Sequence, residues 1–262
     1  MEYGMPSLIC FTTLEQHAAF CRENGYRFVE LNMTYPWFQA ENIPAVALKA
    51  LGKEYGIGFT LHLHDQLNPM ELCAEMRKAS LRVVMQATEL ALQSGLPRIT
   101  MHLMPGTYST VNGIRVYLCE RCKADYLALA DQFRDAVTSK LAGSGTTFCI
   151  ENTAGYLPYQ REAVERLLLS PCFGLTYDIG HDAKTGFRDR DFVLSHAERL
   201  RHFHIHDCDA KANHLALGGG TLEIRPALEL AQRLGASVVI EVKEAGSLAV
   251  SRDYLSRIGM WE

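Results

Sequence analysis

The chain alternates between short apolar runs and amphipathic stretches eight times along its 262 residues. The short runs predict β-strands, and the stretches between them have the period of about 3.6 residues that is typical of helices. Strands separated by helices form parallel sheets, and eight such units in a chain of this size favour a closed (β/α)8 TIM barrel over an open sheet. The expected strands span residues 8–12, 28–33, 58–64, 99–103, 147–150, 173–177, 200–206 and 238–241.

The pattern runs from one end of the chain to the other without a break. No low-complexity linker and no block of like charges divides it, so a single barrel domain over residues 1–262 is predicted. A long helix is expected over residues 113–141. No Gly-x-Gly-x-x-Gly follows an early strand and no Walker-type loop is present, which argues against a nucleotide-binding fold.

Ligand-type side chains stand at the ends of six consecutive predicted strands. They are His62, His102, Glu151, Asp178, His206 and Glu241, and His181 and His214 lie in the loops just beyond. The carboxyl ends of barrel strands meet at one rim, where active sites of such barrels lie, so these side chains are expected to converge. A single such histidine can be a core residue, and a single carboxylate can cap the next helix. The series of six indicates a metal site instead.

The carboxylates strengthen this interpretation. Glu151, Asp178 and Glu241 would meet at one barrel mouth, and three carboxylates that close cannot all stay ionised without a positive charge between them. Lys243 is the one basic residue beside these strand ends. A divalent cation is the simplest solution: carboxylates with one imidazole suit Mn²⁺, Mg²⁺, Co²⁺ or Fe²⁺, and the additional histidines favour Zn²⁺.

Composition argues against nucleic acids and membranes as partners and indicates the cellular compartment. The formal charge of −4 does not support a nucleic-acid-binding surface, and no apolar run approaches the roughly 20 residues that cross a bilayer. The N-terminus lacks a basic region followed by an apolar core, so a secretory signal is not expected. Most of the eight cysteines fall inside apolar runs, which predicts reduced thiols and a cytoplasmic protein.

Seven short segments, spread over nearly the whole chain and in the same order, resemble the xylose-isomerase-like TIM barrels. This superfamily includes sugar isomerases and epimerases, inosose dehydratases and endonuclease IV. The matching segments are Leu61-His62, Met101-His102 with Pro105-Gly106, Ile150-Glu151-Asn152, Tyr177-Asp178-Ile179-Gly180-His181, His204-Ile205-His206-Asp207, His214 leading to Gly218-Gly219-Gly220, and Ile240-Glu241-Val242.

The resemblance to the sugar epimerases implies an enzyme with one divalent metal ion. Its ligands by position are Glu151, Asp178, His206 and Glu241. The two glutamates are implied to flank the substrate carbon, one removing a proton and the other returning it, through an enediolate that the metal stabilises. His181 is implied to contact the substrate or a ligand, and His62 and His102 to shape the pocket.

The resemblance to endonuclease IV implies a different chemistry at the same rim. That enzyme holds three zinc ions, and its ligand pattern also uses positions like His62, His102, His181 and His214. A second or third zinc ion is therefore an alternative here. The acidic residue two positions before the last histidine is replaced by Ala212, which weakens a third site. Together with the acidic net charge, this places a zinc phosphodiesterase second.

The substrate stays open at this stage. The epimerases carry an arginine six residues after their histidine ligand, and Ala212 stands there in this chain. A sugar phosphate, a free ketose and an inositol derivative are all compatible with the pattern, and so is an inosose-dehydratase-like lyase, which shares the enolate chemistry. A small sugar-like substrate is expected in each case except the phosphodiesterase. Barrel helices often pair, which allows a homodimer.

Overall fold

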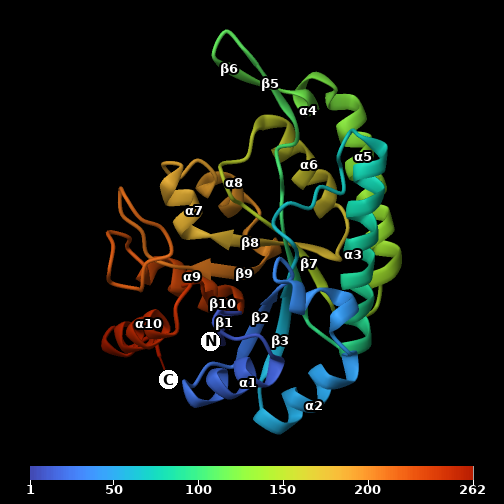
Figure 1. Ribbon diagram of the computed structural model, residues 1–262. Helices are drawn as coiled ribbons and strands as arrows, with labels where there is room; N and C mark the ends of the chain where they lie inside the picture. Colours follow the sequence, from blue (N-terminus) through green and yellow to red (C-terminus); the bar gives the residue numbers. More distant parts are fainter. Residues whose placement is uncertain (262) are drawn as a thin grey trace.

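The computed structural model describes residues 1–261, in which eight parallel strands close into a barrel surrounded by helices (Figure 1). The order around the barrel is β1-β10-β9-β8-β7-β4-β3-β2, and the pairing of Tyr3 with Val238 closes it. The predicted (β/α)8 barrel is confirmed. The barrel strands are β1 Tyr3–Pro6, β2 Phe28–Asn32, β3 Gly58–His62, β4 Arg98–His102, β7 Thr147–Glu151, β8 Phe173–Asp178, β9 Leu200–Ile205 and β10 Ser237–Ile240.

Helices of varied length form the outer layer. Helix α1 begins at a capping box: the Thr13 hydroxyl accepts the Gln16 N–H, and the Gln16 side chain accepts the Thr13 N–H. The helices are α1 Leu14–Glu23, α2 Ala45–Tyr55, α3 Ala74–Ser94, α4 Leu118–Arg121, α5 Lys123–Leu141, α6 Pro158–Leu168, α7 Ile179–Lys184, α8 Arg190–Ser195, α9 Arg225–Leu234 and α10 Ala245–Arg257, with 3-10 turns at Pro36–Phe38, Ala40–Asn42 and Ala197–Arg199.

Strand β9 shows how the barrel wall separates its two faces. Successive side chains of a strand point to opposite sides. Phe203 lies on the outer side, where its ring packs against that of Tyr177 at 6.0 Å. His202 and His204 point inward, where both contact the carboxylate of Glu30 from β2. The barrel interior therefore holds polar side chains at its centre, and the apolar core lies between strands and helices.

The first strand differs from the prediction. Residues 8–12 form a loop, in which Leu8 is buried and Ile9 is 66% exposed, and β1 lies earlier, at Tyr3–Pro6. Gly4 and Pro6 are poor strand formers by composition, so the sequence pattern hid this strand. The barrel needs the glycine: a Cβ at Gly4 would stand 2.3 Å from the Phe28 ring. Close packing between β1 and β2 therefore outweighs the local preference.

The predicted helix over residues 113–141 is wrong in its first part. Residues Tyr108–Val111 (β5) and Ile114–Tyr117 (β6) form an antiparallel hairpin, which projects from the body of the molecule at the top of Figure 1. Its turn is Asn112-Gly113, and both residues have positive φ, 51° and 78°. Asn-Gly is the preferred pair for a two-residue hairpin turn, so the signal was present in the sequence. The helical segment begins only at Leu118.

Among residues 1–261, no helix combines the length and the apolar character that crossing a membrane requires.

We predict that Gly4→Ala destabilises the barrel by about 1–3 kcal/mol, because the added methyl group forces the Phe28 ring out of its place between β1 and β2. Gly246→Ala is the matched control, since a Cβ at this position in α10 meets nothing within 4 Å. Urea unfolding of both variants measures the difference. Equal stability of the Gly4→Ala variant and the wild type would show that Phe28 can be repacked without cost.

Candidate metal centre and active site

Three carboxylates and one histidine converge at the carboxyl ends of the barrel strands. Glu151 and Asp178 are the last residues of β7 and β8, and Glu241 follows the last residue of β10. Each of these residues and His204 offers one ligand atom, and the four atoms lie within 4.8 Å of one another. We call this set the carboxylate quartet: Glu151, Asp178, His204 and Glu241. Glu151, Asp178 and His204 are fully buried.

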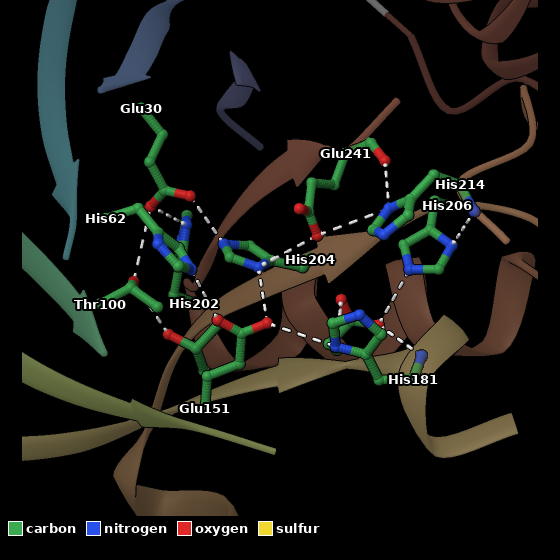
Figure 2. Close-up of polar contacts among 12 residues, drawn as sticks. Glu30, His62, Thr100, Glu151, His181, His202, His204, His206, His214 and Glu241 are labelled. Carbon is green, nitrogen blue, oxygen red and sulfur yellow. Dashed lines mark hydrogen bonds and ion pairs between the residues drawn. The ribbon is translucent and has the colours of Figure 1, made fainter. Parts of the chain in front are cut away.

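The histidine in the quartet is His204, whereas the sequence pointed to His206. His204 Nδ1 lies 3.1 Å from Glu151 Oε1 and 3.4 Å from Glu241 Oε2 (Figure 2). The register of β8 and β9 sets His204 directly beside Asp178, and His206 lies two residues further, beyond the end of β9. Three of the four residues assigned from the sequence are thus brought together, and the fourth belongs to a neighbouring cluster.

His206 lies instead with His181 and His214. Ligand atoms of these three histidines are also within 4.8 Å of one another, and the rings of His206 and His214 are 4.1 Å apart. We call this set the three-histidine cluster. It touches the quartet through Asp178, whose two carboxylate oxygens lie 3.2 Å from His206 Nε2 and 3.2 Å from His181 Nδ1. Gly180 makes room for it, because a Cβ there would lie 1.9 Å from the His206 ring.

The remaining two predicted histidines approach Glu151 from the other side. His62 Nε2 lies 3.1 Å and His102 Nε2 lies 3.4 Å from Glu151 Oε2. His62 Nδ1 lies 2.8 Å from the backbone carbonyl of Leu63, so Nδ1 carries a proton that it donates there. Each oxygen of Glu151 therefore faces imidazole nitrogens, Oε1 toward His204 and Oε2 toward His62 and His102. All the rim positions predicted from the sequence lie in this one region.

A further carboxylate lies deeper in the barrel, and the sequence analysis missed it. Glu30, on β2, is 3% exposed and contacts His202 Nε2 at 3.2 Å and His204 Nε2 at 2.8 Å. The available signal was the spacing of His202, His204 and His206, since side chains two apart on a strand share one face. That spacing indicates three histidines along the inside of the barrel.

Burial and neighbouring charges compete at each carboxylate. Burial raises the pKa of Glu151, but the nearby His204 and His102 outweigh it, and the pKa lies well below its usual range. Burial likewise raises the pKa of Glu241, and Lys243 and His204 reverse the effect. Lys243 Nζ lies 2.7 Å from Glu241 Oε1. Both glutamates are therefore ionised at neutral pH, as metal ligands must be.

The histidines divide into two groups by charge. Burial lowers the pKa of His62, but its contact with Glu151 outweighs this and raises the pKa to about 9. The pKa of His204 is likewise raised well above its usual value by Glu151 and Glu30, against the effect of burial. Burial lowers the pKa of His214 to about 4. The three-histidine cluster thus includes a neutral imidazole, which is the form that binds metals.

Two buried oxygens of the quartet fit a cation. Asp178 Oδ2 and Glu241 Oε2 receive no well-aligned hydrogen bond from any described residue, although both atoms are shielded from solvent. A buried acceptor without a partner costs about 1–3 kcal/mol, and more when it is charged. Hard oxygen donors and one imidazole suit a divalent ion of the first transition row or Mg²⁺. The donor set therefore fits one divalent cation in the quartet.

Residues 18–256 match a family described as the xylose isomerase-like TIM barrel. The chain belongs to this family. No protein of curated function matches the sequence significantly. The predicted superfamily is confirmed by this match.

Solved structures of this family superpose on nearly the full chain. A D-tagatose 3-epimerase-like protein has a TM-score of 0.75 at 20% identity, covering 98% of this chain and 96% of that one. The 3-keto-D-glucoside 4-epimerase YcjR from E. coli has a TM-score of 0.78 at 16% identity, covering 98% and 99%. The IOLI protein, solved with a bound zinc atom, has a TM-score of 0.72 at 12% identity, covering 100% and 99%. At these identities the likeness establishes the shared fold.

We predict that metal-free protein loses stability as the pH rises from about 6.5 to about 9. The pKa of His62 is raised to about 9 in the folded chain, so its contribution is complete below the usual value of 6.5 and disappears as the pH passes about 9. The loss attributable to His62 is about 3 kcal/mol. Unfolding in urea with EDTA, at several pH values, measures it. His62→Gln should remove this part of the pH dependence, and an unchanged dependence in that variant would contradict the assignment.

Proposed function

We propose that the protein is a divalent-metal-dependent sugar isomerase or epimerase whose metal ion is held by Glu151, Asp178, His204 and Glu241. The observation that carries the proposal is the carboxylate quartet: four ligand atoms within 4.8 Å at the active-site rim of the barrel, with two buried oxygens that lack aligned partners. His204 takes the place that the sequence analysis gave to His206. The similarity in fold to sugar epimerases supports a sugar as substrate.

The two glutamates are the proposed acid and base. When bound, the divalent ion would polarise a ketose carbonyl and make the adjacent C–H more acidic. Glu151 and Glu241 face each other across His204, each with one oxygen near Nδ1. Their other oxygens differ: Glu151 Oε2 faces His62 and His102, and Glu241 Oε1 faces Lys243. In each glutamate this second oxygen is the proposed site of proton transfer, and the donor beside it can supply or take up the proton.

Exposure separates the roles of the two glutamates. The side chain of Glu241 is 12% exposed, whereas that of Glu151 is fully buried. Glu241 is therefore the one that an incoming substrate reaches first. Glu151 exchanges its proton with His62 and His102, which line the inner side of the site. In an epimerase one glutamate removes the proton and the other returns it to the opposite face, and in an isomerase one carboxylate does both.

The donor set is compatible with only a few kinds of metal ion. Three carboxylates and one imidazole suit Mn²⁺, Mg²⁺, Co²⁺ or Fe²⁺, and Zn²⁺ accepts the same donors. The IOLI protein of the same fold was solved with zinc. The chemistry of the quartet is the same for each of these ions, because each acts as a Lewis acid.

A second candidate function rests on the three-histidine cluster. His206 occupies the space beside His181 and His214, so three imidazoles meet although the acidic residue expected at Ala212 is lacking. Imidazole nitrogens suit zinc, and a second or third zinc ion would favour a phosphodiesterase resembling endonuclease IV.

Metal content of protein purified without chelator separates the two functions: one divalent ion per chain supports the isomerase, and three zinc ions support the phosphodiesterase. A lyase acting on an inositol-like substrate shares the first chemistry and is recognised by its dehydrated product.

We predict that Glu151→Gln and Glu241→Gln each lower proton exchange on the substrate at least 10²-fold, because general acid–base catalysis contributes about that much. The measurement is deuterium incorporation from D2O into a panel of ketoses with Mn²⁺ or Co²⁺ present. Glu162→Gln is the control, since Glu162 lies on the outer layer in an ion pair with Lys123. Exchange that persists at the wild-type rate in both site variants would overturn the assigned roles.

We predict that Asp178→Asn and His204→Asn abolish or strongly weaken binding of the first divalent ion, by more than about 100-fold, because each removes a direct ligand. His206→Asn tests the alternative assignment from the sequence. It should leave that first ion in place, since His206 lies in the three-histidine cluster. Calorimetric titration with Mn²⁺ compares the three variants. Loss of the first ion in His206→Asn with normal binding in His204→Asn would restore the original assignment.

A further inference from the structure

The buried carboxylate of Glu30 lies one layer below the proposed metal centre. Glu30 sits on β2, three strands around the barrel from β9, and is 3% exposed. Its Oε1 lies 2.8 Å from His204 Nε2, and the Nε2–H direction is off the ideal line, so the contact is an ion pair more than an aligned hydrogen bond. Figure 2 shows His204 between Glu30 on one side and the carboxylates of Glu151 and Glu241 on the other.

Glu30 is held firmly in this position. Its second oxygen, Oε2, accepts hydrogen bonds from the Thr60 and Thr100 hydroxyls at 3.3 and 3.5 Å and contacts His202 Nε2 at 3.2 Å. His202 is itself anchored, because its Nδ1 lies 2.6 Å from Ser237 Oγ. Thr100 also bonds to Thr176 on β8, two strands away around the barrel. These contacts come from five strands of the barrel, so the carboxylate cannot turn without disturbing the barrel interior.

The two nitrogens of His204 therefore face different groups. Nε2 faces the immobile Glu30 carboxylate, and Nδ1 faces the quartet. A carboxylate beside one imidazole nitrogen keeps the proton there, so when a bound cation displaces a proton from the His204 imidazolium, Nδ1 loses it and offers its lone pair. Glu30 thus favours the one tautomer in which Nδ1 can bind a metal ion.

We propose that Glu30 is a positioning residue: it fixes the ring orientation and the tautomer of His204, so that Nδ1 is presented to the metal ion. This inference rests on the proposed metal centre, but not on the sugar reaction. Glu30 makes no hydrogen bond or ion pair with Glu151, Asp178 or Glu241, so its effect on the metal passes through His204.

The test compares Glu30→Gln with His202→Gln by titration with Co²⁺. Glu30→Gln keeps the shape of the side chain and removes its charge. We expect it to weaken the first Co²⁺ site about 10- to 100-fold, with one ion still bound and an altered visible spectrum of the bound ion. His202→Gln disturbs the same buried network, and His202 meets the quartet only through edge-on ring packing with His204, at 5.1 Å between centroids, without contacting any of its carboxylates. It is expected to lower the unfolding midpoint while Co²⁺ affinity stays within about threefold of the wild type, a change of under 1 kcal/mol. Loss of the Co²⁺ signal in Asp178→Asn identifies the site being titrated.

A second measurement needs no substitution at Glu30, should the Glu30→Gln variant fail to fold. Long-range ¹H–¹⁵N correlation spectra of the Zn²⁺-loaded wild type report which histidine nitrogens are protonated, and His204→Asn assigns the signal. We expect a protonated Nε2 and a metal-bound Nδ1 at His204. The opposite arrangement would overturn the inference.

The other outcomes are also decisive. Unchanged Co²⁺ affinity in Glu30→Gln would overturn the positioning role and leave the proposed function untouched. An equal loss of affinity in Glu30→Gln and His202→Gln would show a general effect of the buried network and would also overturn it. Wild-type protein that binds neither Co²⁺ nor Zn²⁺ would overturn both this inference and the proposed metal centre.

Discussion

Carboxylates that are buried together repel one another, and the rim of this barrel brings Glu151, Asp178 and Glu241 into one small space. Imidazoles and one lysine surround these carboxylates and offset their negative charges. Imidazoles surround Glu151 on both of its oxygens, Lys243 contacts Glu241, and His181 and His206 flank Asp178. A metal-binding site must do this, because the ligands have to remain ionised while solvent is excluded. The arrangement of the surrounding strands and loops serves this balance.

Strand β9 connects the centre of the barrel to its rim. Two inward histidines of β9 and a third just beyond its end occupy three levels: His202 near Glu30, His204 between Glu30 and the quartet, and His206 among the loop histidines. Every second residue of the segment 202–206 thus contributes a side chain to a different polar cluster. The same residue type has three different roles because each level of the barrel offers different neighbours.

The fold and most of the rim residues were predictable, because in a parallel barrel the carboxyl ends of all strands meet at one rim. The alternation of strands and helices predicted the fold, and the residues at the strand ends predicted which side chains would meet, including Glu151, Asp178 and Glu241. Local signals failed where tertiary packing overrode them. Strand β1 was not predicted, because it contains Gly4 and Pro6, which are poor strand formers, although close packing against Phe28 requires the glycine. The Asn112-Gly113 turn was visible in the sequence, but the predicted helix began at Gly113, inside this turn.

The sequence by itself determined the barrel, the rim and the set of residue types gathered there, because these follow from periodicity and from where each strand ends. Only the tertiary structure decided between His204 and His206. They are two residues apart, His204 within β9 and His206 just beyond its end, and the choice depends on the register between β8 and β9, which places His204 beside Asp178. The partnership of Glu30 with His204 was decided in the same way. It joins side chains of β2 and β9, which are three strands apart around the closed barrel, and the pattern along one strand does not show which side chain faces it across the interior.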